Sequence, residues 1–443
     1  MADFRWLKID TASIMFSSLS SKEWGRTFRY SAFFTKDIDP VALEKAAKDL
    51  MPYFPATYAY LKKGFFWNYL ALSERQPEIR EENESGMLPI TKRKDGRPDF
   101  RLTYKGNRLN IESSHSLGDG KGIMEYFKAL LKRYNEICNG ETGKYTVDTD
   151  PVKNITNAFS DYYDENGEKA QGDNPKAFHF EEEYEDNYLR LLFAEMSSEK
   201  VKERAHKENL TVTEYLTAVL MLGIIRSRKE PIRERVTVAV PVNLRSFFDT
   251  ESVRNFTIQS FISFSPEGRD DISLKEIIEA TRGQLKAQLK KEELQKTINK
   301  YGGLVNNPVL RIVPNTIKLP VLRKMQQSSH AGVYTILTNY GVCELNESLQ
   351  GVIEKLQFVN GDTRKYGLAV TCSCISFNDT LSLCFSRANR DTVFQNECIK
   401  ILNEVGIETE ISVIEGKGED KKYPDEGFKE GFSAEKIKAY FNI

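Results

Sequence analysis

Cysteine and histidine are scarce in this chain, which has six cysteines and four histidines among 443 residues. Small secreted proteins that depend on disulfides carry cysteine at a much higher density. The low cysteine content therefore indicates a reducing compartment, and we expect a cytoplasmic protein.

The sequence has no apolar run long enough to cross a membrane. Its longest such stretch, Leu216–Ile225, is interrupted by Thr217 and is about half of the ~20 residues that a spanning helix needs. We expect a buried helix there and no integral membrane association. The first twenty residues also lack the uninterrupted apolar core of a secretory signal, because they contain four charged side chains: Asp3, Arg5, Lys8 and Asp10.

An excess of charge of either sign is absent as well. The 63 Lys and Arg residues nearly balance the 64 Asp and Glu residues and leave a net charge of −1. Such a chain has no overall field that attracts nucleic acid or an anionic membrane, so any anionic ligand must meet a local cluster. We expect no nucleic-acid partner, and the composition sets no oligomeric state.

The length implies two to four structural units, at roughly 100 to 200 residues per domain. Residues 139–187 differ from the rest because they have few aliphatic side chains and end near an acidic run at 181–186. We interpret 139–187 as an acidic crossover linker. It would join an N-terminal lobe, residues 1–138, to a C-terminal lobe, residues 188–443.

The N-terminal lobe shows helix and strand signals on both sides of one histidine. Asp39-Pro40 is a cap and first-turn pair, and apolar residues at helical spacing follow it. Residues 100–114 predict two strands hinged at Lys105-Gly106-Asn107. A loop, His115–Gly122, would follow, and then a helix with an apolar face from Ile123 onward.

The C-terminal lobe contains two clear helix starts. Thr211-Val-Thr-Glu214 is a capping-box pattern that opens an apolar helix. Ser273-Leu-Lys-Glu276 opens a long helix that we expect to reach about Lys300. Strands are predicted at 235–240, 257–264, 333–337, 368–377 and 380–386, the last two as a hairpin.

Most of the chemistry lies in the segment Ser113-Ser-His115-Ser-Leu-Gly-Asp119-Gly-Lys-Gly122. Three glycines in five residues, between a strand and a helix, make a backbone-defined loop that can hold a side chain in place. Histidine has an unperturbed pKa of about 6.5, which suits proton abstraction at neutral pH. These residues alone do not exclude the alternative interpretation, in which His115 is a solvated loop residue beside a turn-forming Asp-Gly.

Three segments, in the same order, resemble the His-x-x-x-Asp-Gly acyltransferases, which include chloramphenicol acetyltransferase, alcohol acetyltransferases and peptide-synthetase condensation domains. His115-Ser-Leu-Gly-Asp119-Gly120 is similar to the active-site motif of that family. Val240-Pro-Val-Asn-Leu-Arg245, followed by Asn255-Phe256, resembles its second-lobe strand and loop. Leu337-Thr-Asn-Tyr-Gly341 resembles its late Ser-Asn-x-Gly segment. The resemblance covers nearly the whole chain.

The resemblance implies an α/β (α+β) fold of two chloramphenicol acetyltransferase-like lobes, each a mixed β-sheet flanked by helices, around a central tunnel. In that tunnel a small-molecule acyl donor and acceptor would approach His115 from opposite faces. His115 would act as general base in direct acyl transfer from acyl-CoA to a hydroxyl or amine. Acyl-CoA is then a co-substrate, and neither a bound cofactor nor a metal is implied.

The same resemblance suggests roles for further residues. Asn339 is the expected donor to the oxyanion, with Thr338 second, although Asn339 could equally belong to a strand-ending turn with Gly341. Asp119, Gly120 and Arg245 would be structural at the site. Asp119 is expected to turn away from His115 and form a buried ion pair with Arg245 across the lobes. The rival arrangement is a triad in which Asp119 orients His115.

Two departures from the family motifs indicate which type of acyltransferase to expect. Ser114 stands where condensation domains usually carry a second histidine, and the Asp-Phe-Gly-Trp segment of plant members is missing. These departures favour an acyl-CoA transferase of the alcohol acetyltransferase type. A carrier-protein-dependent condensation-type transferase and a non-catalytic ligand-binding relative stay as alternatives.

The other reactive side chains support weaker hypotheses. Cys372 and Cys374 alternate onto one strand face, and the hairpin would place Cys384 opposite Ser373 on the other face, which argues against a metal cluster. The remaining histidines have no partner motif: His179, His206 and His330. Four basic residues are interpreted as a solvated face in preference to a phosphate site for coenzyme A: Arg311, Lys318, Arg323 and Lys324.

Overall fold

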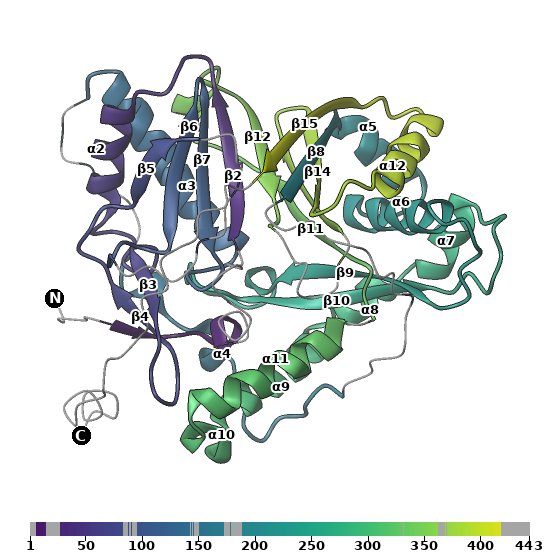
Figure 1. Ribbon diagram of the computed structural model, residues 1–443, viewed down its shortest axis with the longest axis horizontal. Coiled ribbons are helices and arrows are strands. Elements are labelled where there is room, and N and C mark those ends of the chain that lie inside the picture. The colour runs from purple at the N-terminus through teal and green to yellow at the C-terminus, as the bar shows by residue number, and fades with distance from the viewer. Residues whose placement is uncertain are drawn as a thin grey trace.

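The computed structural model describes residues 6–14, 27–82, 87, 90, 95–141, 143, 145, 150–171, 178, 188–330, 332–361, 368 and 370–417. These residues form a mixed α/β structure of two lobes. Each lobe is built on its own large sheet and has its own apolar core. The two sheets stand side by side with helices on their outer sides (Figure 1).

The first lobe is built on a five-stranded sheet with the order β12-β2-β7-β6-β5. Its strands are β2 (Thr27–Phe34), β5 (Glu78–Glu81), β6 (Phe100–Lys105), β7 (Arg108–Ser114) and β12 (Ile353–Val359). β5 runs parallel to β6, and the other pairs are antiparallel. The helices α2 (Pro40–Leu50) and α3 (Gly120–Cys138) cover one face of this sheet (Figure 1).

Local sequence signals account for these elements. Asp39 caps α2 by accepting hydrogen bonds from the amides of Val41 and Ala42. The predicted hairpin is confirmed as β6 and β7. The helix after the histidine loop begins three residues earlier than predicted, at Gly120, because the Asp119 carboxylate caps it.

The second lobe is built on a seven-stranded sheet with the order β10-β9-β11-β13-β14-β8-β15. Its strands are β8 (Tyr188–Ser197), β9 (Val236–Asn243), β10 (Thr257–Phe264), β11 (Thr335–Val342), β13 (Val370–Phe377), β14 (Thr380–Arg387) and β15 (Glu410–Lys417). β11 is parallel to both of its neighbours, and the other pairs are antiparallel. The predicted hairpin is confirmed as β13 and β14.

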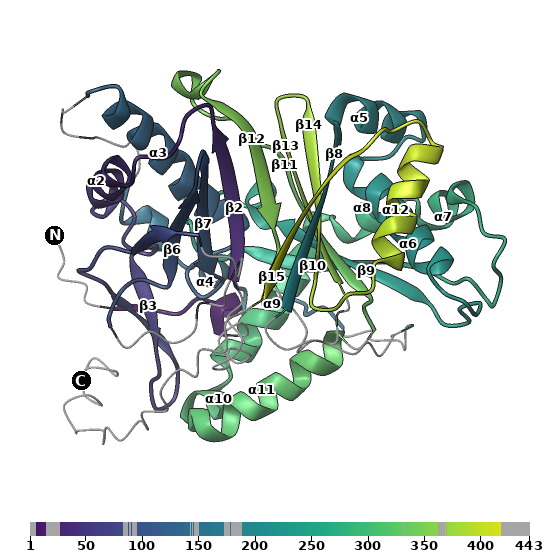
Figure 2. The same cartoon turned by 45° about the horizontal axis from the view of Figure 1, so that its top comes forward.

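One strand of the first sheet comes from the second half of the chain. β12 pairs with the edge of β2, where Phe358 is the register partner of Tyr30. Ser373 Oγ of β13 donates to the Phe358 carbonyl at 2.7 Å, so β12 lies between the two sheets (Figure 2). The sequence predicts that residues 188–443 belong to the C-terminal lobe. The structure differs at β12, which comes from that part of the chain but pairs with the sheet of the first lobe.

Helices cover the outer face of the second sheet. They are α5 (Ser198–Lys207), α6 (Val212–Arg226), α7 (Leu274–Thr281), α8 (Gln284–Gln288) and α12 (Val393–Glu404). The predicted capping box is present at Thr211 and Glu214, and every residue of α6 from Tyr215 to Ile225 is buried. Among the described residues, no single helix has the length and hydropathy of a membrane span; α5 and α6 reach them only as a pair bent by 86°.

The prediction of one helix from Ser273 to about Lys300 is wrong, because this stretch forms α7, α8 and α9 (Lys291–Asn306). Gly283 adopts φ = +78° and ends the first segment. The break turns α8 toward the edge strand β10. There Gln284 and Gln288 bond to the backbone amides of Ser263 and Phe261 at 2.9 and 3.0 Å. Tertiary pairing of an open sheet edge thus overrides the local helix pattern.

The segment interpreted as a linker is partly packed onto the second lobe. It contains a 3₁₀ turn (Lys153–Ile155) and the short helix α4 (Ala158–Asp161), and Phe159 is buried in the second core. The Asn154 carbonyl accepts a hydrogen bond from the Val253 amide at 3.0 Å. The acidic run at 181–186 lies outside the described residues.

A small third sheet and two helices complete the fold. The sheet has the order β1-β4-β3, with β1 (Trp6–Lys8), β3 (Ala59–Lys62) and β4 (Tyr69–Leu72). The helices α10 (Pro308–Ile312) and α11 (Asn315–His330) follow α9 and lie along the lower edge of the molecule (Figure 1). Two further 3₁₀ turns occur at Leu244–Ser246 and Glu347–Leu349.

Candidate active site

His115 lies in the turn that connects β7 to α3, where the first lobe meets the second. Its side chain is half-buried, and its ring lies against Phe28 of β2 with the ring centroids 4.5 Å apart. The Asn255 side chain of the second lobe donates to the His115 carbonyl at 3.0 Å. The predicted base is therefore held between the lobes rather than on a solvated loop.

Asn255 anchors the His115 turn to the N-terminal segment as well. It is 1% exposed, and its amide nitrogen lies 3.1 Å from Asp10 Oδ2 and 3.0 Å from Ser13 Oγ. Ser13 Oγ in turn donates to the Ser116 carbonyl at 3.0 Å. The loop between β9 and β10 and the N-terminal segment thus together fix the backbone carbonyls of His115 and Ser116.

The glycines of the motif allow the second lobe to approach closely. A Cβ atom placed on Gly118 or on Gly122 would overlap the carbonyl oxygen of Val253, which lies in the loop between β9 and β10. A Cβ on Gly120 would lie 2.6 Å from the hydroxyl of Tyr30. Glycine at positions 118 and 122 is therefore required by backbone contact between the lobes, and glycine at position 120 by the Tyr30 side chain of the same lobe; none of the three has an unusual φ angle.

Asp119 is 2% exposed, and its carboxylate accepts three hydrogen bonds. Oδ1 accepts from the Gly122 amide at 2.9 Å, which is the cap of α3. Oδ2 accepts from Arg245 at 2.9 Å and from the Phe256 amide at 2.7 Å, both in the second lobe. The ion pair that the family resemblance implies is thus formed, and the amide of a helix cap, a guanidinium and a backbone amide all bond to the carboxylate.

Arg245 is fixed by more than its carboxylate partner. Its Nε donates to the Ser252 carbonyl at 2.9 Å, another nitrogen donates to the Arg254 carbonyl, and Nη1 also bonds to Asn243 Oδ1 at 3.1 Å. The guanidinium therefore stabilises the loop between β9 and β10 and connects it to the histidine turn. We define the interlobe cluster as Asp119, Arg245, Asn243 and the backbone groups that they bond.

Thr338 and Asn339 are adjacent on β11 and face opposite sides of the second sheet. Thr338 Oγ1 accepts from Asn360, just beyond the end of β12, at 3.1 Å. Asn339 Nδ2 donates to Thr213 Oγ1 in the first turn of α6 at 3.0 Å. Asn339 Oδ1 accepts from the Gly341 amide at 2.8 Å, as in the strand-ending turn. Both polar atoms of Asn339 are thus engaged within the second lobe, whereas Thr338 faces the strand that belongs to the first.

A second contact between the lobes follows the motif directly. Lys121 Nζ donates to the hydroxyl of Tyr340 at 3.1 Å and lies 4.9 Å from the centre of the same ring. Burial raises the pKa of Tyr340, so the phenol stays neutral and can accept this hydrogen bond. The Tyr340 ring meets Tyr30 edge-on at 5.9 Å. The bond between Lys121 and Tyr340 gives the motif lysine a structural partner in place of a phosphate.

Cys372, Cys374 and Cys384 are buried packing residues. Ser373 and Cys384 are register partners, as predicted, and burial raises the pKa of the Cys372 thiol to about 12. Within the described part of the chain, no three His, Cys, Asp or Glu side chains converge as metal ligands. His206 is exposed on α5, whereas His179 and the side chain of His330 lie outside the described residues.

Lys318 differs from the other three residues of the predicted basic face. Arg311, Arg323 and Lys324 are exposed, but Lys318 is 2% exposed, so its assignment to a solvated face is wrong. Its ammonium lies 3.1 Å from the centre of the Trp67 ring and donates to the Phe66 and Leu310 carbonyls at 2.5 and 3.0 Å. Burial lowers its pKa to about 8.

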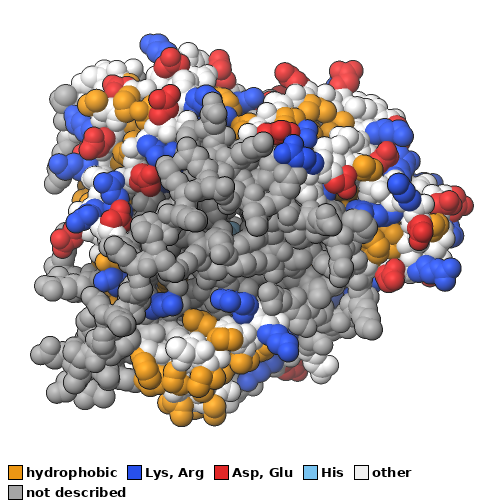
Figure 3. Space-filling model, viewed as in Figure 1, with side chains coloured by type: hydrophobic (Ala, Val, Ile, Leu, Met, Phe, Trp, Pro, Cys, Tyr) orange, Lys and Arg blue, Asp and Glu red, His pale blue; other side chains and the backbone are white. Residues whose placement is uncertain are grey.

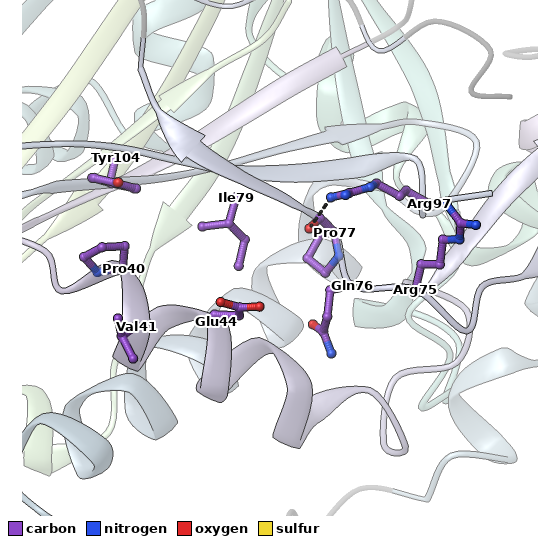
Figure 4. A pocket seen from close by; sticks show the side chains of 9 residues that line it. All are labelled: Pro40, Val41, Glu44, Arg75, Gln76, Pro77, Ile79, Arg97 and Tyr104. Atoms are coloured by element: carbon purple, nitrogen blue, oxygen red, sulfur yellow. Dashed lines mark hydrogen bonds between the residues drawn. The ribbon is translucent and has the colours of Figure 1, made fainter. Parts of the chain in front are cut away.

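A cavity of about 420 Å³ lies in the first lobe (Figure 4). Its walls come from the start of α2, the segment before β5, and β6. They include Glu44, Arg75, Arg97 and Tyr104. Arg97 also donates to the Pro77 carbonyl at 3.5 Å and is 3.5 Å from Asp95. None of the residues described around His115 lines this cavity.

Comparison with known proteins gives structural neighbours only. No family model and no curated protein matches the sequence. TRI3 trichothecene 15-O-acetyltransferase from Fusarium sporotrichioides has 11% identity and a TM-score of 0.63, with 91% of this chain and 96% of that chain covered. F. graminearum TRI101, solved with ethyl coenzyme A, has 12% identity and a TM-score of 0.61, with 91% and 99% covered.

A third neighbour comes from peptide synthesis. The epimerization domain from the third module of tyrocidine synthetase B has 11% identity and a TM-score of 0.58, with 90% of this chain and 96% of that chain covered. At these identities the likeness shows the fold. The chain has the two-lobed chloramphenicol acetyltransferase-like α/β fold that the sequence motifs imply.

Sequence reasoning did not find several residues that hold the site. Phe28, Asp10 and Ser13 carry no motif of their own, and their roles depend on contacts between distant segments. Asn255 was part of the family resemblance, but only the structure gives it a role. The available signal was the pair Asn255-Phe256, whose amide side chain and backbone N–H bond to the two ends of the His115–Asp119 turn.

Proposed function

We propose that the protein is an acyltransferase that moves an acyl group from a coenzyme A thioester to a small hydroxyl or amine acceptor. The observation that carries the proposal is the arrangement of the His115 turn. The turn is fixed by backbone and side-chain bonds between the lobes, while Asp119 of the same turn is bonded to Arg245, Phe256 and Gly122. The imidazole is then the proton acceptor of the motif, and Asp119 is a positioning residue.

In the proposed reaction, a ring nitrogen of His115 takes the proton of the acceptor as its oxygen or nitrogen attacks the thioester carbonyl carbon. The new ester or amide bond forms, the C–S bond breaks, and the proton passes to the departing coenzyme A thiolate. A general base of this kind contributes about 10²–10⁴-fold. No covalent acyl-enzyme is required.

Of the two expected oxyanion donors, we propose Thr338 ahead of Asn339. Thr338 is bonded to Asn360 at the end of β12, and β12 carries Phe358, which meets the same Phe28 ring that lies against His115. A hydroxyl that accepts one hydrogen bond still has its own proton to donate. Asn339 has committed both polar atoms to Thr213 and Gly341 and is proposed to support β11.

The neighbours support this proposal at the level of substrate class. TRI101 of F. sporotrichioides was solved with coenzyme A and T-2, with 10% identity to this chain and a TM-score of 0.60. The same fold also occurs in the tyrocidine synthetase domain. A donor held on a carrier protein is therefore the second candidate for the same chemistry.

The experiment follows free-thiol release from a panel of acyl-CoA thioesters with mixed alcohol and amine acceptors. We expect acceptor-dependent release with at least one donor, and a loss of about 10²–10⁴-fold in His115→Ala. His206→Ala is the matched control, because His206 is exposed on α5. Release within about tenfold of wild type in His115→Ala would remove the base assignment. Turnover with a loaded carrier protein but with no acyl-CoA would establish the second candidate instead.

A further inference from the structure

The helices α10 and α11 present their apolar side chains to solvent. Five residues on their outer side are between 51% and 71% exposed: Val309, Ile312, Ile317, Val321 and Met325. We call this set the α10–α11 ridge. On α11 the residues are four apart, which places them on one helix face. Hydrophobic side chains gather at this lower edge of the molecule, with Lys and Arg beside them (Figure 3).

The inner face of α11 carries the polar contacts. The Asn315 amide donates to the Phe65 carbonyl at 2.8 Å, and its side chain donates to the Gly64 carbonyl at 2.9 Å. Lys318 is buried against Trp67 on the same inner side. Leu322 of α11 also packs into the first core, so the helix has apolar residues on both its inner and its outer side. A surface helix of a soluble protein normally keeps its apolar residues on the side that faces the core. The bonds of Asn315 and Lys318, together with Leu322, therefore hold α11 with a second apolar stripe exposed.

The charged side chains that α10 and α11 themselves carry are of one sign. The chain has 64 acidic residues in 443, yet none occurs between Glu293 and Glu344. Three cations on these two helices are exposed: Arg311, Arg323 and Lys324. Phe65, which is 48% exposed, adds an aromatic ring next to the start of α11. The two helices thus combine exposed aliphatic side chains with cations and contain no acidic residue of their own, and Phe65 adds an aromatic ring.

We propose that the α10–α11 ridge is a membrane-surface site that docks on a bilayer containing anionic headgroups. Interfacial helices have this composition, with apolar residues entering the headgroup and acyl boundary while Lys and Arg meet lipid phosphates. The ridge lies on an outer edge of the molecule (Figure 1), and such an edge can enter a lipid surface without a matching groove. The exposed cations of α10 and α11 complement anionic headgroups, which favours a bilayer that contains them as the partner of the ridge. The inference is independent of the chemistry at His115.

The experiment measures binding of the full chain to vesicles of phosphatidylcholine alone and with about one third phosphatidylserine. We expect binding to the phosphatidylserine vesicles that weakens as salt is raised. The double variant Ile317→Gln/Val321→Gln should bind at least about tenfold more weakly, because two exposed apolar side chains no longer enter the bilayer. Val152→Gln/Val393→Gln is the matched control on other exposed valines and should bind as wild type does.

A second double variant tests whether the cations of α11 contribute to vesicle binding. Arg323→Ser/Lys324→Ser should weaken binding at low salt by about fivefold for each charge removed. Lys202→Ser/Lys207→Ser on α5 is the control. Equal binding of wild type and the α11 variants, or no binding to either vesicle, would overturn the proposal. Two other outcomes would also overturn the proposal, if no vesicle binding is seen. Self-association that depends on Ile317 and Val321 would show that the ridge contacts a second copy of the chain. Binding to an acidic carrier protein that depends on the same residues would show that the ridge contacts a protein partner. His115→Ala should bind vesicles unchanged.

Discussion

Two buried ionic clusters stabilise this molecule in different ways. The first, which we call the sheet cluster, lies on one face of the first sheet and contains Arg29, Glu82, Arg101, Arg108 and Glu112. The ion pairs among its described residues all join side chains of the first lobe. The interlobe cluster has a single carboxylate, Asp119, which bonds across the lobes to Arg245 and to the Phe256 amide. Arg245 in turn bonds to backbone carbonyls of its own lobe.

Because their partners differ, the two clusters have different roles: one stabilises a lobe, and the other positions the histidine turn. In the sheet cluster, Arg29 Nη1 is 2.7 Å from Glu82, and Glu112 bonds to both Arg29 and Arg101. Burial by itself would raise the pKa of Glu112, but the charges of Arg101 and Arg29 outweigh it and keep that pKa below 4.5. The sheet cluster therefore contributes to one lobe, whereas the interlobe cluster determines where the histidine turn lies relative to the other lobe.

The largest effect is expected from Glu112→Gln, which leaves two buried guanidinium groups without their shared carboxylate. We expect a loss of about 4–5 kcal/mol in the free energy of unfolding, measured by urea denaturation. The control is Glu125→Gln, because Glu125 is 46% exposed and its salt bridges to Lys121 and Lys128 are solvated. A loss below about 1 kcal/mol in Glu112→Gln would show that the sheet cluster is not a major source of stability.

Glu112→Gln should also change how the free energy of unfolding depends on pH. Both carboxylates of the sheet cluster have lowered pKa values in the folded state. Their contribution is complete above the unfolded pKa of about 4.3 and is lost as the pH falls through the folded value. Wild type should therefore lose stability more steeply than Glu112→Gln below about pH 5.

The next effect concerns the interlobe pair. Asp119→Ala and Arg245→Ala should each cost about 3–4 kcal/mol, because each leaves a buried charged partner. The double variant should be more stable than the sum of the two losses predicts, with a coupling energy of about 1–3 kcal/mol. The measurement is a double-mutant cycle by urea unfolding. Fully additive losses would mean that the two side chains do not stabilise each other and would reopen the triad interpretation of Asp119.

A smaller loss of stability is expected from Asn255→Ala, which removes the donor to the His115 carbonyl. Turnover should fall about tenfold because the histidine turn loses one of its anchors, and stability should fall by about 1–3 kcal/mol. Asn135→Ala is the matched control, since Asn135 is also buried and donates to the Ser348 carbonyl at 3.0 Å. It should lose stability without losing kcat. A similar loss of kcat in both variants would remove the positioning role of Asn255.

The smallest effect is expected at Lys318, a buried cation with no carboxylate within salt-bridge distance among the described residues. Burial lowers its pKa to about 8, so between about pH 8 and 10 the unfolded chain binds a proton that the folded protein does not. Stability relative to Lys318→Met should therefore rise with pH in that window. Urea unfolding of both proteins at about pH 8 and at about pH 10 measures this rise, and a parallel pH response of the two proteins would contradict the assignment.

The sequence predicts elements whose signals are local. The Asp39-Pro40 cap, the Thr211–Glu214 capping box and the hairpin of β13 and β14 are all observed. The ion pair of Asp119 with Arg245 was predicted from resemblance to a family rather than from local physics. Asn339 and Thr338 were named together, but their opposite orientations depend on the phase of β11 relative to its neighbours.

Other features depend on contacts that no local pattern encodes. The break at Gly283 depends on two glutamines that bond to the edge of β10. Lys318 was grouped with Arg311, Arg323 and Lys324 as a solvated face, yet Trp67 and two carbonyl groups surround it. The joining of β12 to β2 could not be foreseen, since both strands carry ordinary strand composition.

The transfer of β12 to the first sheet also sets the order in which the chain can fold during synthesis. β2 leaves the ribosome more than three hundred residues before its partner β12. Until then the backbone groups of β2 on that side form an open sheet edge, which is a template for pairing with other chains. The first lobe therefore completes its sheet only near the end of translation. Long-range pairing of this kind slows folding and makes the nascent first lobe a natural client of chaperones that shield exposed strand edges.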